Sequence, residues 1–344
     1  MTGVTATRLR ARHLLLALVV LAIAVTASTL LGAIDLGWHR VLAEIWAQLT
    51  GGTSPLSERE AAILWQLRMP RIVLGGLVGA ALAVSGAAFQ GVFRNPLADP
   101  YLLGAAAGAG LGATIVVALA PSATNWFVGP LPIAAFLGAV GGVALTSLLG
   151  RSAGAGTATL LLAGIAVASF LTATQTFVLQ LNAETLRQVY TWMLGGLGTA
   201  GWQQVLLVLP YIAGAAVVLC ACGRLLDVLT LGDEEAGSLG VNPGRMRLLV
   251  LAAASLATAC AVSVSGLIGF VGIVVPHVVR MLAGASYRVL VPLSLIGGAA
   301  FLIVADVVAR TAFAPSELPI GVVTAFTGAP FFLVVLRTTR GRTR

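Results

Sequence analysis

Three consecutive carboxylates stand out in a chain that has only 12 acidic residues. They are Asp233, Glu234 and Glu235, in the run Leu231-Gly-Asp-Glu-Glu-Ala-Gly-Ser-Leu-Gly-Val241. Acidic side chains in a first helical turn are stabilised by the helix dipole, and Gly240 fits a helix stop, so the run predicts a short helix. Such a helix, flanked by glycines, could dock a soluble partner. It could equally be part of an ordinary solvated loop.

Two arginines, Arg68 and Arg71, flank Pro70 at the start of an apolar run. Arginines at such a place can extend to lipid headgroups. They can also form forked ion pairs with carboxylates of a docking protein. Further along, Asp306 and Arg310 have the i, i+4 spacing that places opposite charges on one helix face. Charges inside an apolar helix usually neutralise one another, so we expect this pair to be structural.

Metal and proton chemistry have weak support in the sequence. Cys220 and Cys222 could form a ligand pair, but no His or carboxylate lies close to them in the sequence. Small thiols that pack inside helices are the simpler interpretation, also for Cys260. His277 follows Pro276 in an apolar run, where packing is expected. No series of acidic residues runs through the apolar segments, which argues against a proton-coupled carrier.

Every basic residue counted in the sequence is Arg, and there is no Lys. A P-loop needs a Lys that reaches the β- and γ-phosphates, within the pattern G-x-x-x-x-G-K-[ST]. The chain therefore cannot be a P-loop ATPase. If it takes part in ATP-driven transport, the ATPase is a partner, and ATP and Mg²⁺ are bound there. We expect no cofactor and no metal in this chain.

These residues are set in a strongly apolar chain. Of the 344 residues, 58% are hydrophobic and 9% are charged, against about 25% charged in soluble proteins. A soluble fold could not bury this much apolar surface, so we predict an all-α integral membrane protein, with residues 1–344 in a single transmembrane domain. The net charge of +8 comes from arginines scattered between apolar runs, so nucleic-acid binding is not expected.

A membrane span needs roughly 20 apolar residues. Runs near this length predict ten spans, at about 14–33, 72–93, 101–120, 131–149, 158–181, 203–222, 246–265, 268–284, 291–313 and 319–337. The first run follows Arg8, Arg10 and Arg12, as in a signal peptide. It is longer than the usual apolar region of a signal peptide, so we expect an uncleaved first helix.

The arginines predict the orientation of these spans. An even number of spans places both termini on one side. Of the 20 arginines, 14 then lie on the side of the termini and six on the other side. Positive loops stay inside, so we predict cytoplasmic termini and a long cytoplasmic loop at residues 223–247.

A weak internal repeat is visible. The run Ala83-Val-Ser-Gly86 is followed by Pro96, and Ala261-Val-Ser-Val-Ser-Gly266 is followed by Pro276. In both, the Pro comes ten residues after the Gly. The two segments would cross the membrane in opposite directions, as in an inverted repeat of five plus five helices, a plan common in transporters. A chance match of short apolar motifs is an equal alternative.

On several motifs the sequence resembles the FecCD-type permease subunits of bacterial ATP-binding-cassette (ABC) importers for ferric siderophores, haem and cobalamin. The matching stretches, in the family's order, are Arg68–Arg71, Val78–Gln90, Arg94–Pro100, Tyr190–Gly196, Leu231–Val241, Gly266–His277, Asp306–Arg310 and Glu317–Pro330. They cover roughly residues 60 to 335, with no clear departure inside the motifs.

The resemblance implies ten transmembrane helices with the type II importer fold, in the bacterial cytoplasmic membrane. It implies that two permease copies, or this chain and a paralogue, enclose one path. Two ATPase subunits would dock below, and a periplasmic or lipid-anchored substrate-binding protein above. Arg68 and Arg71 would contact that binding protein. The residues implied in coupling to the ATPase are Leu231, Gly232, Asp233, Glu234, Glu235, Ala236, Leu239 and Gly240.

Two other classes remain open. An ion-coupled secondary transporter can also be built from inverted repeats, and it would work without an ATPase. An exporter or a membrane scaffold without transport activity is a further alternative. The sequence favours the importer permease but does not identify the chelate.

Overall fold

The computed structural model describes residues 9–32, 34–119, 129–154 and 156–340, and every regular element among them is helical. Among these described residues, seven helices are long and apolar enough to span a membrane. They are α1 (Ala11–Leu30), α4 (Met69–Phe93), α6 (Pro130–Ser152), α7 (Thr157–Leu181), α9 (Trp202–Ala221), α12 (Pro243–Ser265) and α14 (Tyr287–Thr311). Three further apolar helices are α5 (Ala105–Leu119), α13 (Val271–Ala283) and α15 (Ile320–Arg340).

Each of the ten predicted apolar runs coincides with one of these helices. The boundaries differ by a few residues where polar or glycine residues intervene. The helix predicted at 268–284 begins only at Val271, because the stretch 266–269 is not helical. The helix predicted from 291 begins at Tyr287, four residues before the apolar run, since Tyr287 and Arg288 are polar but helical.

Shorter helices lie between the apolar ones. They are α2 (Trp38–Thr50), α3 (Glu58–Ala62), the π-helix η1 (Ile63–Arg68), the 3₁₀-helices η2 (Pro100–Leu103) and η3 (Ala183–Thr185), α8 (Leu186–Met193), α10 (Gly223–Leu229) and α11 (Asp233–Ser238). Helices α3, η1 and α4 follow one another without a break from Glu58 to Phe93.

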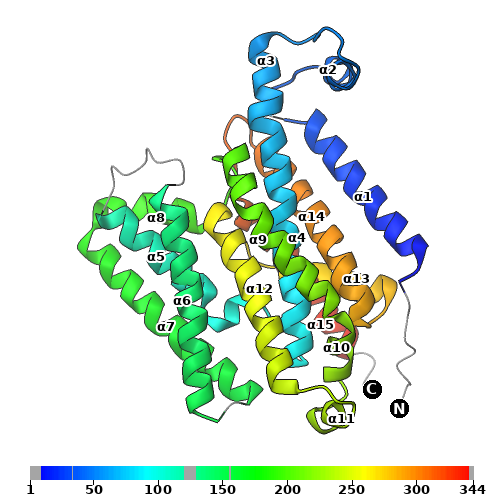
Figure 1. Cartoon of the computed structure of the whole chain (residues 1–344). Coiled ribbons are helices and arrows are strands. Elements are labelled where there is room, and N and C mark those ends of the chain that lie inside the picture. Colours follow the sequence, from blue (N-terminus) through cyan, green and yellow to red (C-terminus); the bar gives the residue numbers. More distant parts are fainter. Residues whose placement is uncertain (1–8, 33, 120–128, 155, 341–344) are drawn as a thin grey trace.

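Helix α4 forms the centre of the bundle, between α12 and α14 (Figure 1). Its packing depends on glycines, since lipid provides no hydrophobic drive between helices and close backbone contact must hold them. A Cβ atom on Gly79 would collide with the carbonyl of Gly298 in α14, and one on Gly86 with the carbonyl of Gly272 in α13. Helices α5, α6 and α7 pack together beside this centre.

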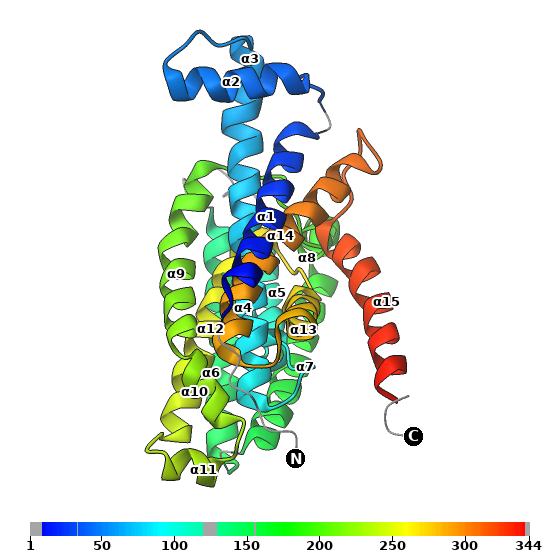
Figure 2. The ribbon, with the colours of Figure 1, turned by 90° about the vertical axis from the view of Figure 1, so that its right-hand side faces the viewer.

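The two ends of the molecule differ. Helices α2 and α3 lie at one end and α11 at the other (Figure 2). Helix α1 begins and α15 ends on the half that holds α11. This is the arrangement expected when both termini are on one side. Arg8, Arg342 and Arg344, which contributed to the predicted charge bias, lie outside the described residues.

The two copies of the predicted short repeat differ in local structure. Gly86 lies inside α4 and Pro96 follows the end of that helix. Gly266, in contrast, ends α12 with a positive φ of 68°, and Pro276 lies inside α13. The motif match is therefore wrong as a structural equivalence, because Gly-Leu-Ile-Gly interrupts the second helix where Gly86 is followed by Ala-Ala-Phe. Helices α4 and α12 do run in opposite directions (Figure 1).

Candidate functional site

The candidate site for coupling to a partner is the short pair of helices α10 and α11 at one end of the bundle. Helix α10 is fixed by Leu226 and Leu229, which are fully buried against α4 and α14. Helix α11 begins at Asp233 and buries only Ala236. The predicted short helix is thus confirmed.

The predicted helix stop is also confirmed. Gly240 has a φ of 78°, in the left-handed region that favours glycine. Around it, the amide of Gly240 donates to the carbonyl of Gly237, and that of Val241 to the carbonyl of Ala236, at 3.0 Å each. Gly232, at a φ of 144°, turns the chain into the helix. The glycines therefore let α11 stand as a separate unit between α10 and α12.

Asp233 is held by two arginines from distant parts of the sequence. Arg247, at the start of α12, donates to both carboxylate oxygens, at 2.8 and 2.5 Å. Arg94, directly after α4, forms a second ion pair with Asp233 and donates to the carbonyl of Leu229 at 2.7 Å. Hydrogen bonds first from Arg247 and then from Arg94 lower the pKa of Asp233. Asp233 thus links α11 to the ends of α4 and α12.

Asp227 forms a second link, which sequence reasoning missed. Its carboxylate accepts hydrogen bonds from the hydroxyl of Ser286 at 2.7 Å and the amide of Tyr287 at 2.6 Å. Arg288 lies 3.6 Å away as an ion pair. Asp227 therefore joins α10 to the first turn of α14. Because these residues are about 60 positions apart, no local pattern could have indicated the pairing.

The outer surface of the loop is left free for a partner. Glu234 and Glu235 are exposed, and within the described chain their carboxylates have no hydrogen bond or ion pair. Leu231 and Leu239 are also exposed, at 56% and 61%. Two carboxylates beside two large apolar side chains suit a partner that offers basic and apolar groups.

Arg68, predicted at the opposite end, is buried, with 6% of its surface exposed. It donates to the carbonyl of Thr29 at 2.7 Å and to that of Ile34 at 2.8 Å. These carbonyls lie at and after the end of α1, where helix carbonyls lack partners within the helix. Arg68 thus fastens α1 to the start of α4, so its guanidinium is occupied inside the subunit.

Arg71 lies in an ion-pair cluster. It donates to Asp306 at 2.8 Å and to Glu317 at 2.9 Å. Asp306 is 3.2 Å from Arg310, so the predicted i, i+4 pair is confirmed. Arg310 in turn donates to the carbonyl of Ser28 at 2.7 Å. These charges border a cavity of about 260 Å³, which Arg68, Arg71, Arg310 and Glu317 line together with apolar residues.

Helix α2 is another feature that sequence reasoning missed. It buries Glu44, whose carboxylate accepts hydrogen bonds from Ser54, from Trp65 at 3.0 Å and from Gln48 at 3.2 Å. The Ser54 bond is the main cause of its lowered pKa. The helical spacing of Val41, Glu44 and Ala47, all buried, is the signal that could have predicted an amphipathic helix.

Metal binding has no support in the part of the chain that the structure describes. No group of three or more His, Cys, Asp or Glu residues is placed to hold an ion. Cys220, Cys222 and Cys260 are all free thiols. His277 packs edge-on against Phe331, with ring centroids 5.7 Å apart.

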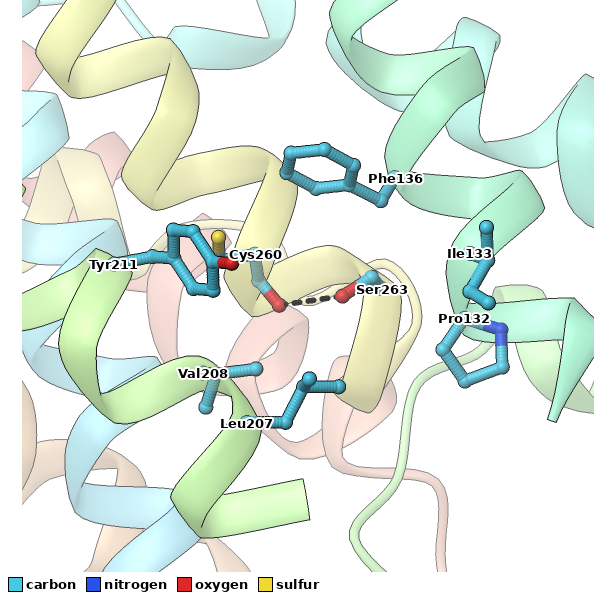
Figure 3. Close-up of a pocket in the computed structure, with 8 residues that line it drawn as sticks. All are labelled: Pro132, Ile133, Phe136, Leu207, Val208, Tyr211, Cys260 and Ser263. Carbon is cyan, nitrogen blue, oxygen red and sulfur yellow. Dashed lines mark hydrogen bonds between the residues drawn. The ribbon is translucent and has the colours of Figure 1, made fainter. Parts of the chain in front are cut away.

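A pocket of about 300 Å³ between α6, α9 and α12 also lacks polar chemistry (Figure 3). Tyr211, Cys260 and Ser263 bring the only polar side-chain atoms among the lining residues. The hydroxyl of Ser263 donates to the carbonyl of Cys260 at 2.8 Å, inside its own helix. This pocket therefore offers little that could hold a charged chelate.

The chain is similar to known transport proteins. The sequence pattern of the FecCD transport family matches residues 18–338. The cobalamin import system permease protein BtuC of Halobacterium salinarum is 44% identical over 281 residues, which cover 81% of this chain and 74% of that one. The hemin transport system permease protein HmuU of Yersinia pestis is 37% identical over 345 residues, 98% of each chain. An ABC transporter of metal-chelate type, solved in an inward-facing conformation, has a TM-score of 0.82 and 29% identity, covering 96% of this chain and 100% of that one.

Proposed function

This chain belongs to the FecCD transport family and is the non-catalytic permease subunit of an ABC transporter, and on that premise we propose that it imports an iron-siderophore, or a haem- or cobalamin-type chelate. Its similarity to a hemin permease over almost the whole length, and to a cobalamin permease over most of it, supports this class of substrate. The apolar helices carry few charged residues, which agrees with this proposal. A transport path must release its substrate as well as admit it, and few charges mean that a chelate is not held tightly on the way.

In this proposal the ten apolar helices all cross the bacterial cytoplasmic membrane, as a five-plus-five inverted arrangement of the type II importer fold. Both termini and α11 face the cytoplasm, while α2 and α3 face outward. Two copies, or this chain and a paralogue, enclose the path. Helix α15 supports such an interface, since it is set off from the bundle (Figure 2) and exposes Phe326, Leu333 and Val334.

The observation that carries the proposal is that α11 and the residues flanking it expose carboxylates and leucines on one side, while Asp233 ties the helix to the bundle on the other. Glu234, Glu235, Leu231 and Leu239 would contact one of two ATPase subunits. Asp233, behind them, is tied to the ends of α4 and α12. A displacement of residues 225–241 on ATP-driven closure of the ATPase pair would thus tilt helices of the bundle centre. This is alternating access with the energy supplied from another polypeptide.

At the outer end, a ligand-loaded binding protein would deliver the substrate. Arg71 is the better placed of the two predicted arginines, because Arg68 is buried and satisfied by backbone carbonyls. Glu317, the exposed partner of Arg71, would compete with a carboxylate of the binding protein. Glu317→Gln should therefore tighten docking a few-fold, and Arg71→Glu should weaken it. Unchanged affinity in both variants would leave Arg71 a purely structural residue.

Co-purification tests the assembly directly. The chain should co-purify with an ABC ATPase whose hydrolysis is stimulated by the loaded binding protein. Charge reversal at Glu234 and Glu235 should abolish this association, while the same reversal at the outer residue Glu58 should preserve it. Association that survives the reversal of Glu234 and Glu235 would contradict the assignment of α11.

A further inference from the structure

A basic cavity opens between α6, α7 and α12, at the end of the bundle that holds α11. Its volume is about 300 Å³. Its lining includes three arginines, Arg151, Arg245 and Arg247, together with Leu160, Leu248 and Leu251, and no carboxylate is among the lining residues that the structure describes. The cavity therefore concentrates positive charge where three helices end or begin.

Two of these arginines have donor groups without a hydrogen-bond partner. Within the described chain, the side chains of Arg151 and Arg245 have no hydrogen bond or ion pair, and both are exposed. Arg247 gives its two terminal nitrogens to Asp233, but its Nε is buried without any partner. The donors that an oxygen-rich anion in the cavity can reach are therefore those of Arg151 and Arg245, and hydrogen bonds from a charged guanidinium to such an anion are strong.

The other wall of the cavity is apolar and continues onto surface that suits hydrocarbon. Leu160 and Leu251 line the inside. Leu148 of α6 and Leu248 of α12 are exposed at 66% and 48%. Arg151 and Arg245 lie at the ends of α6 and α12, each about one helical turn from one of these exposed leucines. This arrangement matches the level in a bilayer at which phosphate headgroups meet acyl chains.

We propose that this cavity binds the phosphate headgroup of an anionic phospholipid, with Arg151 and Arg245 as donors, Arg247 as a further positive charge in the wall and an acyl chain along the leucines. The favoured occupant is a lipid because the charged and apolar walls adjoin. Arg247 also holds Asp233, so an occupied cavity would brace α11. That consequence for coupling rests on the proposed function, whereas the lipid site does not.

Lipid binding to the purified full chain tests the site. In neutral detergent, native mass spectrometry should show dioleoyl phosphatidylglycerol bound at least tenfold more tightly than dioleoyl phosphatidylcholine. The double variant Arg151→Gln/Arg245→Gln should weaken phosphatidylglycerol binding roughly thirtyfold, from about 1 kcal/mol for each arginine. Arg224→Gln, at the same end but outside the cavity, should leave binding unchanged. Arg151→Lys/Arg245→Lys, which keeps the charge, should restore most of it.

Several results would overturn the proposal. Equal binding of the two lipids, or wild-type binding by a folded double glutamine variant, would remove the site. Displacement of the lipid by millimolar inorganic phosphate would indicate a site for free anions. If the double variant kept its lipid but lost the ATPase, the arginines would belong to the ATPase contact. The lipid measurements use the purified chain without the ATPase or the binding protein, so failure of the lipid site leaves the proposed function untouched, and that function is tested separately.

Discussion

Replacing Asp306 by Asn should be among the most damaging single changes at the end of the bundle opposite α11. The Asp306 side chain is only 2% exposed, and it lies between Arg71 and Arg310, whose side chains are 14% and 6% exposed. Removing its charge leaves two poorly solvated guanidinium groups with only Glu317 nearby. Removal of one partner from a buried ion pair costs about 3–5 kcal/mol, so we expect a loss of this size in the free energy of unfolding.

Glu317→Gln provides the matched control. Glu317 pairs with the same Arg71 at a similar distance, 2.9 Å against 2.8 Å for Asp306, but its side chain is 43% exposed. Exposed pairs contribute about 0–1 kcal/mol, so this variant should be close to wild type. Unfolding in detergent, followed by helical circular dichroism against denaturant, compares the two. Equal losses in the two variants, or a loss below about 1 kcal/mol for Asp306→Asn, would refute the reasoning from burial.

Three further predictions concern α11. Replacing Glu234 and Glu235 by Arg should leave membrane insertion and the free energy of unfolding unchanged but weaken ATPase binding at least tenfold, measured by titration with labelled ATPase. Binding with wild-type affinity would show that the ATPase contacts another part of the chain. Asp233→Asn should lower the free energy of unfolding by about 1 kcal/mol or less, because the ion pairs of Asp233 are half exposed. It should nevertheless lower the amount of substrate transported per ATP hydrolysed. An unchanged ratio would show that Asp233 does not take part in coupling. Because the pKa of Asp233 is lowered, its pairs should be intact above the ordinary value of about 3.9 and lost only as the pH falls further. A spin label on Ser238→Cys, in a Cys220→Ser background, should therefore keep its mobility from neutral pH down to about 5, and loosening above that pH would contradict the pKa argument.

The long helices were predictable because their signal is local. Each of the ten apolar runs corresponds to a helix, and the short helix after Gly232 followed from one run of residues. The Asp306 and Arg310 pair was predictable for the same reason, since i, i+4 spacing is a property of one helix.

Contacts between distant segments could not be predicted in this way. Arg68 was expected at an outer surface, but the last turn of α1 and the chain after it each supply a carbonyl to its guanidinium. Arg94 and Arg247 were counted only for their charge, although both hold Asp233 from positions 139 and 14 residues away. The choice of partner for each arginine is made by the packing of helices, which hydropathy does not encode.

Uptake into liposomes tests the central claim most directly. The chain should be reconstituted with its ABC ATPase, with the loaded binding protein outside and ATP inside the vesicles. We predict substrate accumulation that requires ATP, the ATPase and the binding protein together, and none from an ion gradient alone. Uptake by the purified chain driven by an ion gradient, without an ATPase, would contradict the account.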